Sequence, residues 1–187
     1  CPNTRCATSS SDVHEFAESS RFPIVVKAAA AWLSPKLNVS GVRSERELLD
    51  LWHRTASPEN PNLLLQEYIP SGEDWFFHGY CNGASDCLAG FTGLKLRSSP
   101  PHAGITTLGR SVGNAALAHQ ARALLKAISY AGIMDLDYRF DKRDGQYRLL
   151  DFNPRIGAQF RLFVDDNGLD VARALYRDLT VQTVRRS

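Results

Sequence analysis

The sequence is poor in cysteine and has no long apolar run. Its 187 residues contain four cysteines, Cys1, Cys6, Cys81 and Cys87, and none forms a Cys-x-x-Cys pair. That number is too small for a disulfide-rich scaffold, and the spacing matches no common zinc site, so we expect reduced, structural thiols. No segment approaches the ~20 apolar residues that cross a membrane, and no signal-like stretch is visible. The absences exclude disulfide-stapled and helical membrane proteins.

The sequence also lacks a strong excess of charge of one sign. Its net charge is +2, which favours neither a nucleic acid nor a membrane surface as a partner. Hydrophobic residues make up 43% and charged residues 22%, as in globular proteins that bury a core. We therefore expect a cytoplasmic protein of one domain or two small lobes. Because Cys1 is no natural start, we also expect further residues before it.

Helices are predicted where polar caps precede apolar residues at helical spacing. The strongest prediction covers residues 114–131, a stretch rich in alanine that Gly132 can end. Ser44 and Glu47 form a capping box before a second helix. Two further helices follow Ser11-Asp12 and Asp170. The four predicted ranges are 12–20, 45–56, 114–131 and 168–180.

Strands are predicted in β-branched and apolar runs that are bounded by turn residues. The turn-rich "NGASD" and "KRDG" each join two such runs, so both pairs are expected to be antiparallel. Residues 1–11 are small and polar and are expected to form a loop. The mixed order of elements predicts an α+β fold. The expected strands are residues 22–27, 62–69, 75–83, 87–98, 133–141 and 146–154.

The second hairpin carries an unusual set of polar residues within the run "LLDFNPR". Side chains alternate along a strand, so Asp151, Asn153 and Arg155 are expected to point the same way. The hairpin should bring the region of Asp135 opposite that of Asp151. Carboxylate and amide oxygens in such proximity suit Mg²⁺, and a guanidinium beside them suits phosphate.

Solvent exposure is the alternative explanation for these polar residues. It applies most readily to Asp137 and Asp141, which solubility alone would explain. It applies poorly to the Asp-x-Asn-Pro-Arg run, which is embedded in apolar residues.

The segment "GIMDLDYRFD…YRLLDFNPRIG" resembles the C-terminal signature of ATP-grasp enzymes, in which Gly-x-x-acid precedes acid-x-Asn-x-Arg. Three earlier segments resemble other landmarks of this superfamily in the expected order. "FPIVVKA" resembles the strand that delivers a nucleotide-binding lysine, and "LLLQEYIPSGED" resembles the connection between the lobes. "LKLRSSPPHAG" resembles a basic segment of carboxylate–amine ligases. The resemblance covers residues 20–160.

The resemblance implies an ATP-grasp fold, with two small α+β lobes whose antiparallel sheets sandwich the nucleotide. Residues 1–66 would form the small lobe, and residues 67–187 the large lobe with the metal and phosphate site. It implies an enzyme that uses ATP and Mg²⁺ to form an amide, or a related bond, through an acyl phosphate. The carboxylase and carbamoyl-phosphate chemistries of the superfamily are lesser branches.

The resemblance also implies how the nucleotide would be bound. Lys27 would hold phosphates, as a point charge on a rigid strand. In Gln66, Glu67, Tyr68 and Ile69, the backbone near Glu67 and the Ile69 N–H would read adenine. Glu73 would take the ribose hydroxyls, with Asp74 as its rival.

The remaining matched residues would act on the phosphates and the substrate. Lys95 and Arg97, pointing the same way on a strand, would neutralise phosphate charge or hold a carboxylate. Asp135, Asp151 and Asn153 would bind one or two Mg²⁺ ions. Arg155 would stabilise the transferring phosphoryl group. His78 and His102 have no role in this scheme.

Two departures from the family pattern leave other functions open. The stretch "AAAAWLSPKLNVSG" stands where many members have a glycine-rich loop, and Lys36 is not expected to compensate for it. No residues match the usual N-terminal domain, which we expect as a partner from the same protein. A small carboxylate, an amine acceptor and a homodimer are the other expected partners. A nucleotide-binding domain without turnover and a non-catalytic interaction domain are the alternatives.

Overall fold

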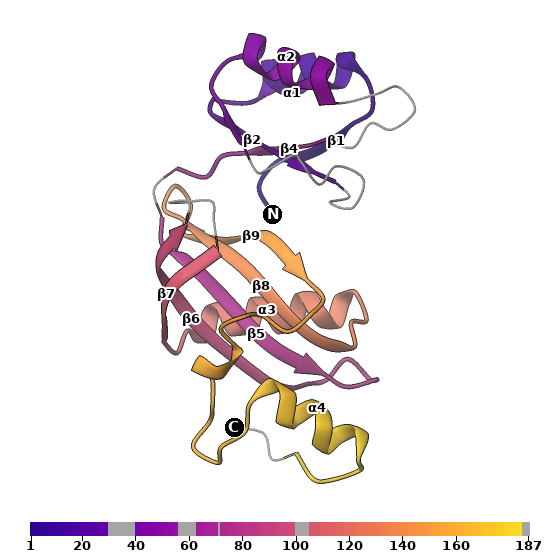
Figure 1. The fold of residues 1–187 in the computed structure, drawn as a ribbon, viewed down its shortest axis with the longest axis vertical. Helices are drawn as coiled ribbons and strands as arrows, with labels where there is room; N and C mark the ends of the chain where they lie inside the picture. The colour runs from indigo at the N-terminus through magenta and orange to yellow at the C-terminus, as the bar shows by residue number, and fades with distance from the viewer. Residues whose placement is uncertain (30–39, 56–62, 71, 100–104, 185–187) are drawn as a thin grey trace. The chain divides into compact units, whose positions relative to one another are not determined.

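The computed structural model describes residues 1–29, 40–55, 63–70, 72–99 and 105–184. The chain divides into two compact units, residues 1–70 and residues 71–187 (Figure 1). We expected the boundary after Gln66, and the chain divides after Pro70. Each unit pairs an antiparallel sheet with helices, which confirms the predicted α+β class. In the described residues, no helix has both the length and the hydropathy needed to cross a bilayer.

The first unit is a four-stranded sheet with two helices on one of its faces (Figure 1). Val26 and Leu65 are register partners, and both side chains lie in the core under the helices with Phe16 and Leu48. The opposite face of the sheet carries the alternate residues of the same strands. In sheet order the strands are β1 (Thr4–Ala7), β4 (Leu63–Glu67), β2 (Ile24–Ala28) and β3 (Ser40–Val42); the helices are α1 (Ser10–Ser19) and α2 (Glu45–Thr55).

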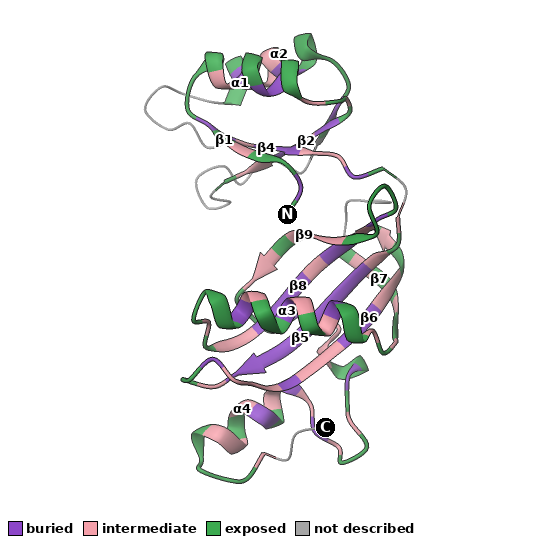
Figure 2. Cartoon of the chain, turned by 180° about the vertical axis from the view of Figure 1, so that it is seen from behind, coloured by how far each residue is buried: buried purple, intermediate pink, exposed green. Residues whose placement is uncertain are grey.

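The second unit is a five-stranded antiparallel sheet with β5 at its centre. Figure 2 shows that β5 is buried along almost its whole length. In sheet order the strands are β7 (Ile105–Ser111), β6 (Cys87–Ser99), β5 (Asp74–Cys81), β8 (Gly132–Asp141) and β9 (Gln146–Asn153); the helices are α3 (Ala115–Ala127), α4 (Val171–Leu179) and the short η1 (Phe160–Leu162).

Helices cover both faces of this sheet. Trp75 and Phe77 of β5 pack with Leu117 of α3 on one face. Tyr80, one of the alternate residues of β5, packs with Val171 of α4 on the other. Because both faces are covered, β5 reads as a nearly continuous apolar run and shows no polar alternation. The two sides are called the α3 face and the α4 face below.

Several elements differ from the sequence-based expectations. β1, predicted as loop, and β3 and β7, which were not predicted, are short or largely exposed strands that lack an apolar run. α3 ends at Ala127, earlier than expected, since Ser129 has a φ of 53° and turns the chain. Gly132, with a φ of 126°, begins β8 and does not end the helix.

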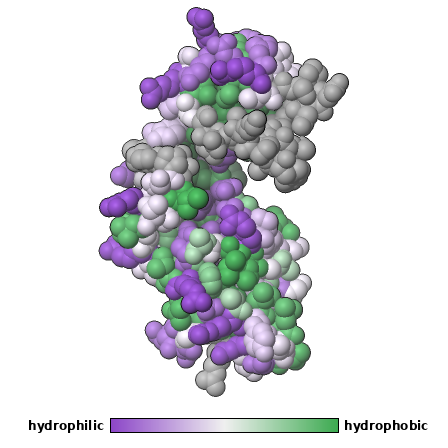
Figure 3. Space-filling model, viewed as in Figure 1, coloured by the Kyte–Doolittle hydropathy of each residue, from purple (hydrophilic) through white to green (hydrophobic). Residues whose placement is uncertain are grey.

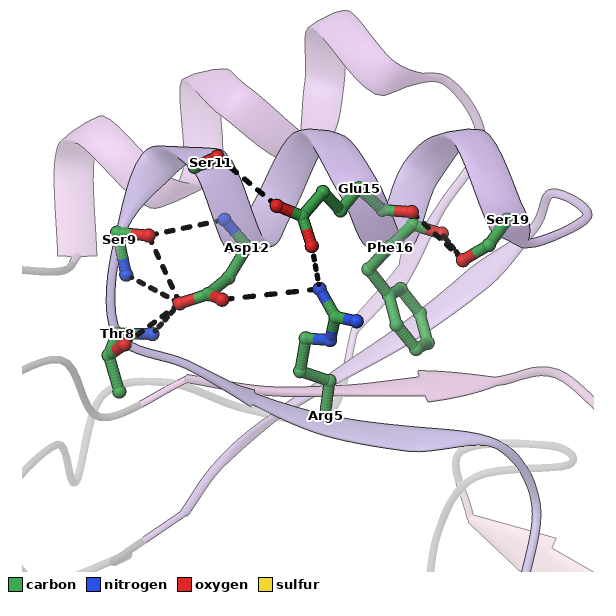
Figure 4. Close-up of polar contacts among 8 residues, drawn as sticks. All are labelled: Arg5, Thr8, Ser9, Ser11, Asp12, Glu15, Phe16 and Ser19. Atoms are coloured by element: carbon green, nitrogen blue, oxygen red, sulfur yellow. Dashed lines mark hydrogen bonds and ion pairs between the residues drawn. The ribbon is translucent and has the colours of Figure 1, made fainter.

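A network of polar contacts closes the N-terminus of α1 (Figure 4). Ser9 is the N-cap: its hydroxyl accepts from the Asp12 N–H at 3.2 Å, and the Asp12 carboxylate accepts from the Ser9 N–H at 3.0 Å. The same carboxylate accepts from the N–H and hydroxyl of Thr8 at 2.9 and 2.8 Å. These hydrogen bonds, led by that from the Thr8 backbone, lower the pKa of Asp12 to about 2. The expected cap at Ser11-Asp12 therefore lies nearer the start of the helix, at Ser9.

We expect Ser9→Ala to lower the stability of the chain near neutral pH by about 1 kcal/mol, the usual worth of an N-cap. Asp12→Asn should also destabilise it, since the charged acceptor is lost. The folded pKa of Asp12 is about 2 against 3.8 ordinarily, so its contribution is present above about pH 4 and fades as the pH falls towards 2. Denaturant titrations near neutrality and at about pH 3 should show the difference between wild type and Asp12→Asn narrowing in acid.

Ser10→Ala is the matched control, because it removes a neighbouring hydroxyl outside the cap. A difference between wild type and Asp12→Asn that is equal at both pH values would contradict the assigned role of the carboxylate.

Candidate functional site

Two pairs of polar residues face each other across the β8–β9 ladder. Asp135 lies opposite Asn153, and Asp137 lies opposite Asp151. Opposite residues of an antiparallel pair point to the same side, and residues two apart do as well, so all four lie on one face. It is the α4 face, because the alternate residues of β8 pack in the core beneath α3.

The observed register differs from the expected one, which placed Asp135 opposite the region of Asp151. The ladder shifts between Asp137 and Tyr138, where β9 carries Leu150 as an extra residue. Such a bulge adds one residue to one strand only and moves every later pair by one position. The four polar residues still converge, in a different pairing.

Strand β5 adds two more polar residues to this face. His78 lies opposite Asp135, and Asp74 lies opposite Arg139. Arg139 donates to Asp74 from Nε at 2.6 Å and from Nη2 at 3.0 Å, which is a bidentate ion pair. Asp74 is therefore engaged inside its own sheet.

Lys95 of β6 contacts the same acidic row. Its Nζ lies 2.7 Å from Asp137 Oδ1, and only 11% of its side chain is exposed. Burial raises the pKa of Asp137, and the ammonium of Lys95 acts against that rise. The lysine expected to meet phosphate is thus held against a carboxylate of the same face.

Asp135 and His78 form the buried centre of the face. Their residues are 6% and 0% exposed, and His78 Nε2 lies 3.2 Å from Asp135 Oδ1. Burial raises the pKa of Asp135 to about 7, with the Asp137 charge acting in the same direction. Burial lowers the pKa of His78 to about 4, with Lys95 adding to the effect. The pair is therefore built to carry little charge at neutral pH.

The segment that follows β9 covers this buried pair. The Phe163 ring stacks on the His78 ring at 4.9 Å between centroids, and Phe76 meets His78 edge-on at 5.4 Å. A Cβ at Gly157 would lie 2.4 Å from both Asp135 Oδ2 and His78 Cε1, so only glycine permits this approach. The chain after the Asp-x-Asn-x-Arg run thus closes one end of the polar row.

The other end of the row is open to solvent at Asp151, Asn153 and Arg155. The Asn153 amide donates to Asp151 Oδ2 at 3.3 Å, and Arg155 Nη2 donates to Asn153 Oδ1 at 3.3 Å. The three side chains therefore lie side by side, as the alternation predicted. Hydrophilic and hydrophobic residues are interspersed on the side of this unit seen in Figure 3.

Arg97 does not share the face of Lys95, although the two were expected to point the same way. Lys95 lies opposite Gly109 of β7, whereas Arg97 lies opposite Leu108. Leu96 between them is an extra residue at a register shift, and neighbouring residues of β7 face opposite sides. Arg97 is exposed.

Lys27 lies in the first unit, on the sheet face away from the helices. Its partner across the ladder is Leu64, and Gln66 of the same strand points to the same side. Lys27 is half-buried, and the Gln66 amide donates to the Thr4 hydroxyl at 3.2 Å. The first sheet therefore presents a lysine and an amide on its uncovered face.

The predicted adenine and ribose residues lie around the end of β4 and the start of β5. The Glu67 N–H donates to the Asn3 carbonyl at 2.8 Å, while Tyr68 is half-buried and Ile69 buried. Glu73 is exposed, and its carboxylate accepts from the Trp75 indole at 3.3 Å. Of the two candidate acids, Glu73 is the more accessible.

The donor set of the polar row fits a hard cation in its chemistry. In the described residues, no three His, Cys, Asp or Glu side chains are gathered closely enough to hold an ion. The available oxygens come from Asp135, Asp151 and the Asn153 amide. Asp135 Oδ1 is buried and has no hydrogen-bond partner among the described residues, as expected for an oxygen that awaits a ligand.

Sequence reasoning missed two members of this face. His78 was left without a role, and exposure seemed the best explanation of Asp137. The alternation Asp74, Phe76, His78 along β5 carries a signal for one polar side, but the pairing with β8 decides which residues meet. Lys36 and His102, together with most of the "AAAAWLSPKLNVSG" stretch, lie outside the described residues.

No protein-family profile matches the sequence. A D-aspartate ligase of Enterococcus faecium is 40% identical over 57 residues, which are 30% of this chain and 13% of that protein.

Solved structures match over almost the whole chain. The biotin carboxylase domain of 2-oxoglutarate carboxylase from Hydrogenobacter thermophilus, in complex with MgADP and bicarbonate, is 16% identical with a TM-score of 0.69. It covers 96% of this chain, which spans 41% of that one. The N5-carboxyaminoimidazole ribonucleotide synthetase of Thermotoga maritima is 14% identical with a TM-score of 0.63, and the match covers 99% and 45%. The chain thus spans less than half of these structures, and the likeness establishes a shared fold.

We expect Asp135→Asn to stabilise the chain in mild alkali. The folded pKa of Asp135 is about 7 against 3.8 ordinarily, so ionising the buried carboxyl costs stability as the pH rises from about 4 to 7. At about pH 8 the variant should be more stable by a few kcal/mol, since one pKa unit corresponds to about 1.4 kcal/mol. Near pH 4 the difference should be about zero. Denaturant titration across this range measures it.

Asp166→Asn, at an exposed position, controls for the loss of one negative charge. An Asp135→Asn variant that is less stable than wild type at every pH would show that the carboxylate stabilises the fold.

Proposed function

We propose that this chain, which has the ATP-grasp fold, is the nucleotide-binding part of an ATP-dependent ligase that joins a carboxylate to an amine. One observation carries the proposal: Asp135 and Asp137 of β8 face Asn153 and Asp151 of β9 on one side of a sheet, with Arg155 beside them. Such a group has no use in a core and is more than solubility requires. It suits the binding of a triphosphate with its metal ion.

The acidic row would supply the metal ligands. Asp135, Asp151 and the Asn153 amide would hold Mg²⁺, which neutralises charge on the phosphates when bound. The Asp135 carboxyl, whose pKa is about 7, would have to give up its proton to bind the ion. Nucleotide affinity should therefore rise with pH across neutrality.

Arg155 would act on the transferred phosphoryl group. Its guanidinium is exposed and lies next to the Asn153 amide, where it can meet phosphate oxygens with two parallel N–H groups. In the ligase reaction it would stabilise charge that develops as the carboxylate takes the phosphoryl group, and charge on the acyl phosphate that follows.

The remaining residues would bind the rest of the nucleotide and the substrate. Lys27 would contact phosphates, and Glu73 the ribose. Lys95 and Arg97 would meet phosphate or the substrate carboxylate, which for Lys95 requires release from Asp137. Adenine would be read by the backbone of four residues: Gln66, Glu67, Tyr68 and Ile69.

The acceptor and the bond formed are the least constrained part of the proposal. The short match to a D-aspartate ligase makes an amino acid the first substrate to test. An amine that attacks the acyl phosphate would release inorganic phosphate and form an amide. Carboxylation is the second choice, because the biotin carboxylase domains share the fold.

A nucleotide-binding domain without turnover is the second candidate. It is favoured by Lys95, which is largely buried and paired with Asp137 at 2.7 Å. Calorimetry with a non-hydrolysable ATP analogue and Mg²⁺, followed by phosphate-release assays with a panel of amino acids, separates the two. Binding with release supports the ligase, and binding without release in the full-length protein supports the second candidate.

Arg155→Ala and Asp151→Asn should each weaken binding of the Mg²⁺–nucleotide about ten- to hundredfold, because each removes a charge-assisted contact worth about 1.5–3 kcal/mol. Calorimetry at fixed Mg²⁺ measures the change in Kd. Arg110→Ala is the matched control: it removes an exposed arginine of β7 whose partner, Leu94, packs on the α3 face. Equal affinity in wild type and Arg155→Ala would overturn the proposed site.

A further inference from the structure

A second cavity lies on the α3 face, away from the acidic row. It has a volume of about 490 Å³ and lies between α3 and residues 85–90 at the start of β6. Cys87 forms part of one wall, and His119, Arg122 and Lys126 of α3 form part of the other. The proposed ligase reaction uses none of these residues.

Two thiols meet at this cavity. Cys87 lies directly opposite Cys81 in the β5–β6 ladder, and both pack against the core beneath α3. Asn82 donates to the Asp86 carbonyl at 3.0 Å, so alternation along the ladder makes the cysteines a non-hydrogen-bonded pair. The Cα atoms of such pairs approach to about 4.5 Å, within the range that a disulfide spans. Both cysteines are free thiols here.

The two sulfurs differ in access. Cys81 is 1% exposed, whereas Cys87 is partly exposed and lines the cavity. A hydrogen bond with Cys87, followed by burial, raises the pKa of Cys81 well above its ordinary value. A reagent in the cavity therefore reaches the sulfur of Cys87 first, with Cys81 directly behind it.

The cavity also carries positive charge. Lys126 Nζ donates to the Ala84 carbonyl at 2.8 Å and lies 3.3 Å from Asp86 Oδ1, which holds the turn against α3. Arg122 is exposed, and no carboxylate of the described residues forms an ion pair with it. One guanidinium next to the thiols is thus available to an anionic ligand.

We propose that Cys87 is a modification site that reacts with anionic low-molecular-weight disulfides, and that Cys81 resolves the product into a Cys81–Cys87 disulfide. Arg122 would attract the carboxylates of the reagent and place its S–S bond over Cys87. The exposed Cys1 and Cys6 lie in the first unit and have no such cavity among the described residues.

The reaction proceeds by two exchanges. Cys87 loses its thiol proton and its sulfur attacks the small disulfide, whose S–S bond breaks and releases one thiolate. Cys81 then loses its proton and attacks the Cys87 sulfur, which expels the second thiolate and forms the bond between the strands. Two protein thiols are oxidised, and one small disulfide is reduced to two thiols that take up the two protons.

Glutathione disulfide is the probe, and a Cys1→Ser/Cys6→Ser background removes the exposed thiols. Intact mass and peptide mapping should show the loss of two hydrogen atoms and a Cys81–Cys87 linkage. Cys81→Ser should trap the mixed disulfide on Cys87, and Cys87→Ser should abolish both products. Reaction of Cys81 at the unchanged rate in Cys87→Ser would overturn the proposal. So would a background protein that stays unmodified, a result independent of whether any variant folds.

Charge recognition is tested with Arg122→Gln. This variant should react about two- to fivefold more slowly with glutathione disulfide, the effect of one exposed charge pair, and at the unchanged rate with the neutral hydroxyethyl disulfide. Arg161→Gln, at an exposed position after β9, is the matched control. Equal slowing with both reagents, or with neither, would remove the anionic specificity.

Discussion

The pairing of β8 between β5 and β9 is the constraint on which the second unit depends. It is antiparallel on both sides, and its register decides that Asp135 meets His78 on one strand and Asn153 on the other. A shift by one residue would send every side chain of β8 to the opposite face. The carboxylates would then enter the apolar core under α3, so the packing of that core protects the arrangement of the polar row.

The polar row is graded from dry to wet, and this gradient joins stability to chemistry. Asp135 is enclosed by His78 and Gly157, whereas Asp151 and Arg155 reach solvent. A buried carboxylate is costly unless it meets a cation. The fold accepts that cost at one residue and leaves the neighbouring positions accessible. An enzyme that must bind a charged ligand commonly stores instability in this way.

The hairpin, its alternation and the α+β class could be predicted from the sequence because they depend on local periodicity. The register could not, because Leu150, an ordinary apolar residue, forms the bulge. His78 was missed for a related reason: its meaning depends on a strand far away in the chain. β7 was missed because its mostly exposed residues carry no apolar pattern. Caps were predictable in kind, though the first lies at Ser9 and not at Ser11.

The irregular ladder between β6 and β7 has a consequence for how copies of the protein meet. β7 is an outermost strand, and regular strands at sheet borders recruit strands from other molecules. Two successive shifts, between Lys95 and Ser98, break the even spacing of the pair. A kinked border offers a poor template for intermolecular pairing and fibril growth, so the same bulge that separates Lys95 from Arg97 also guards against aggregation.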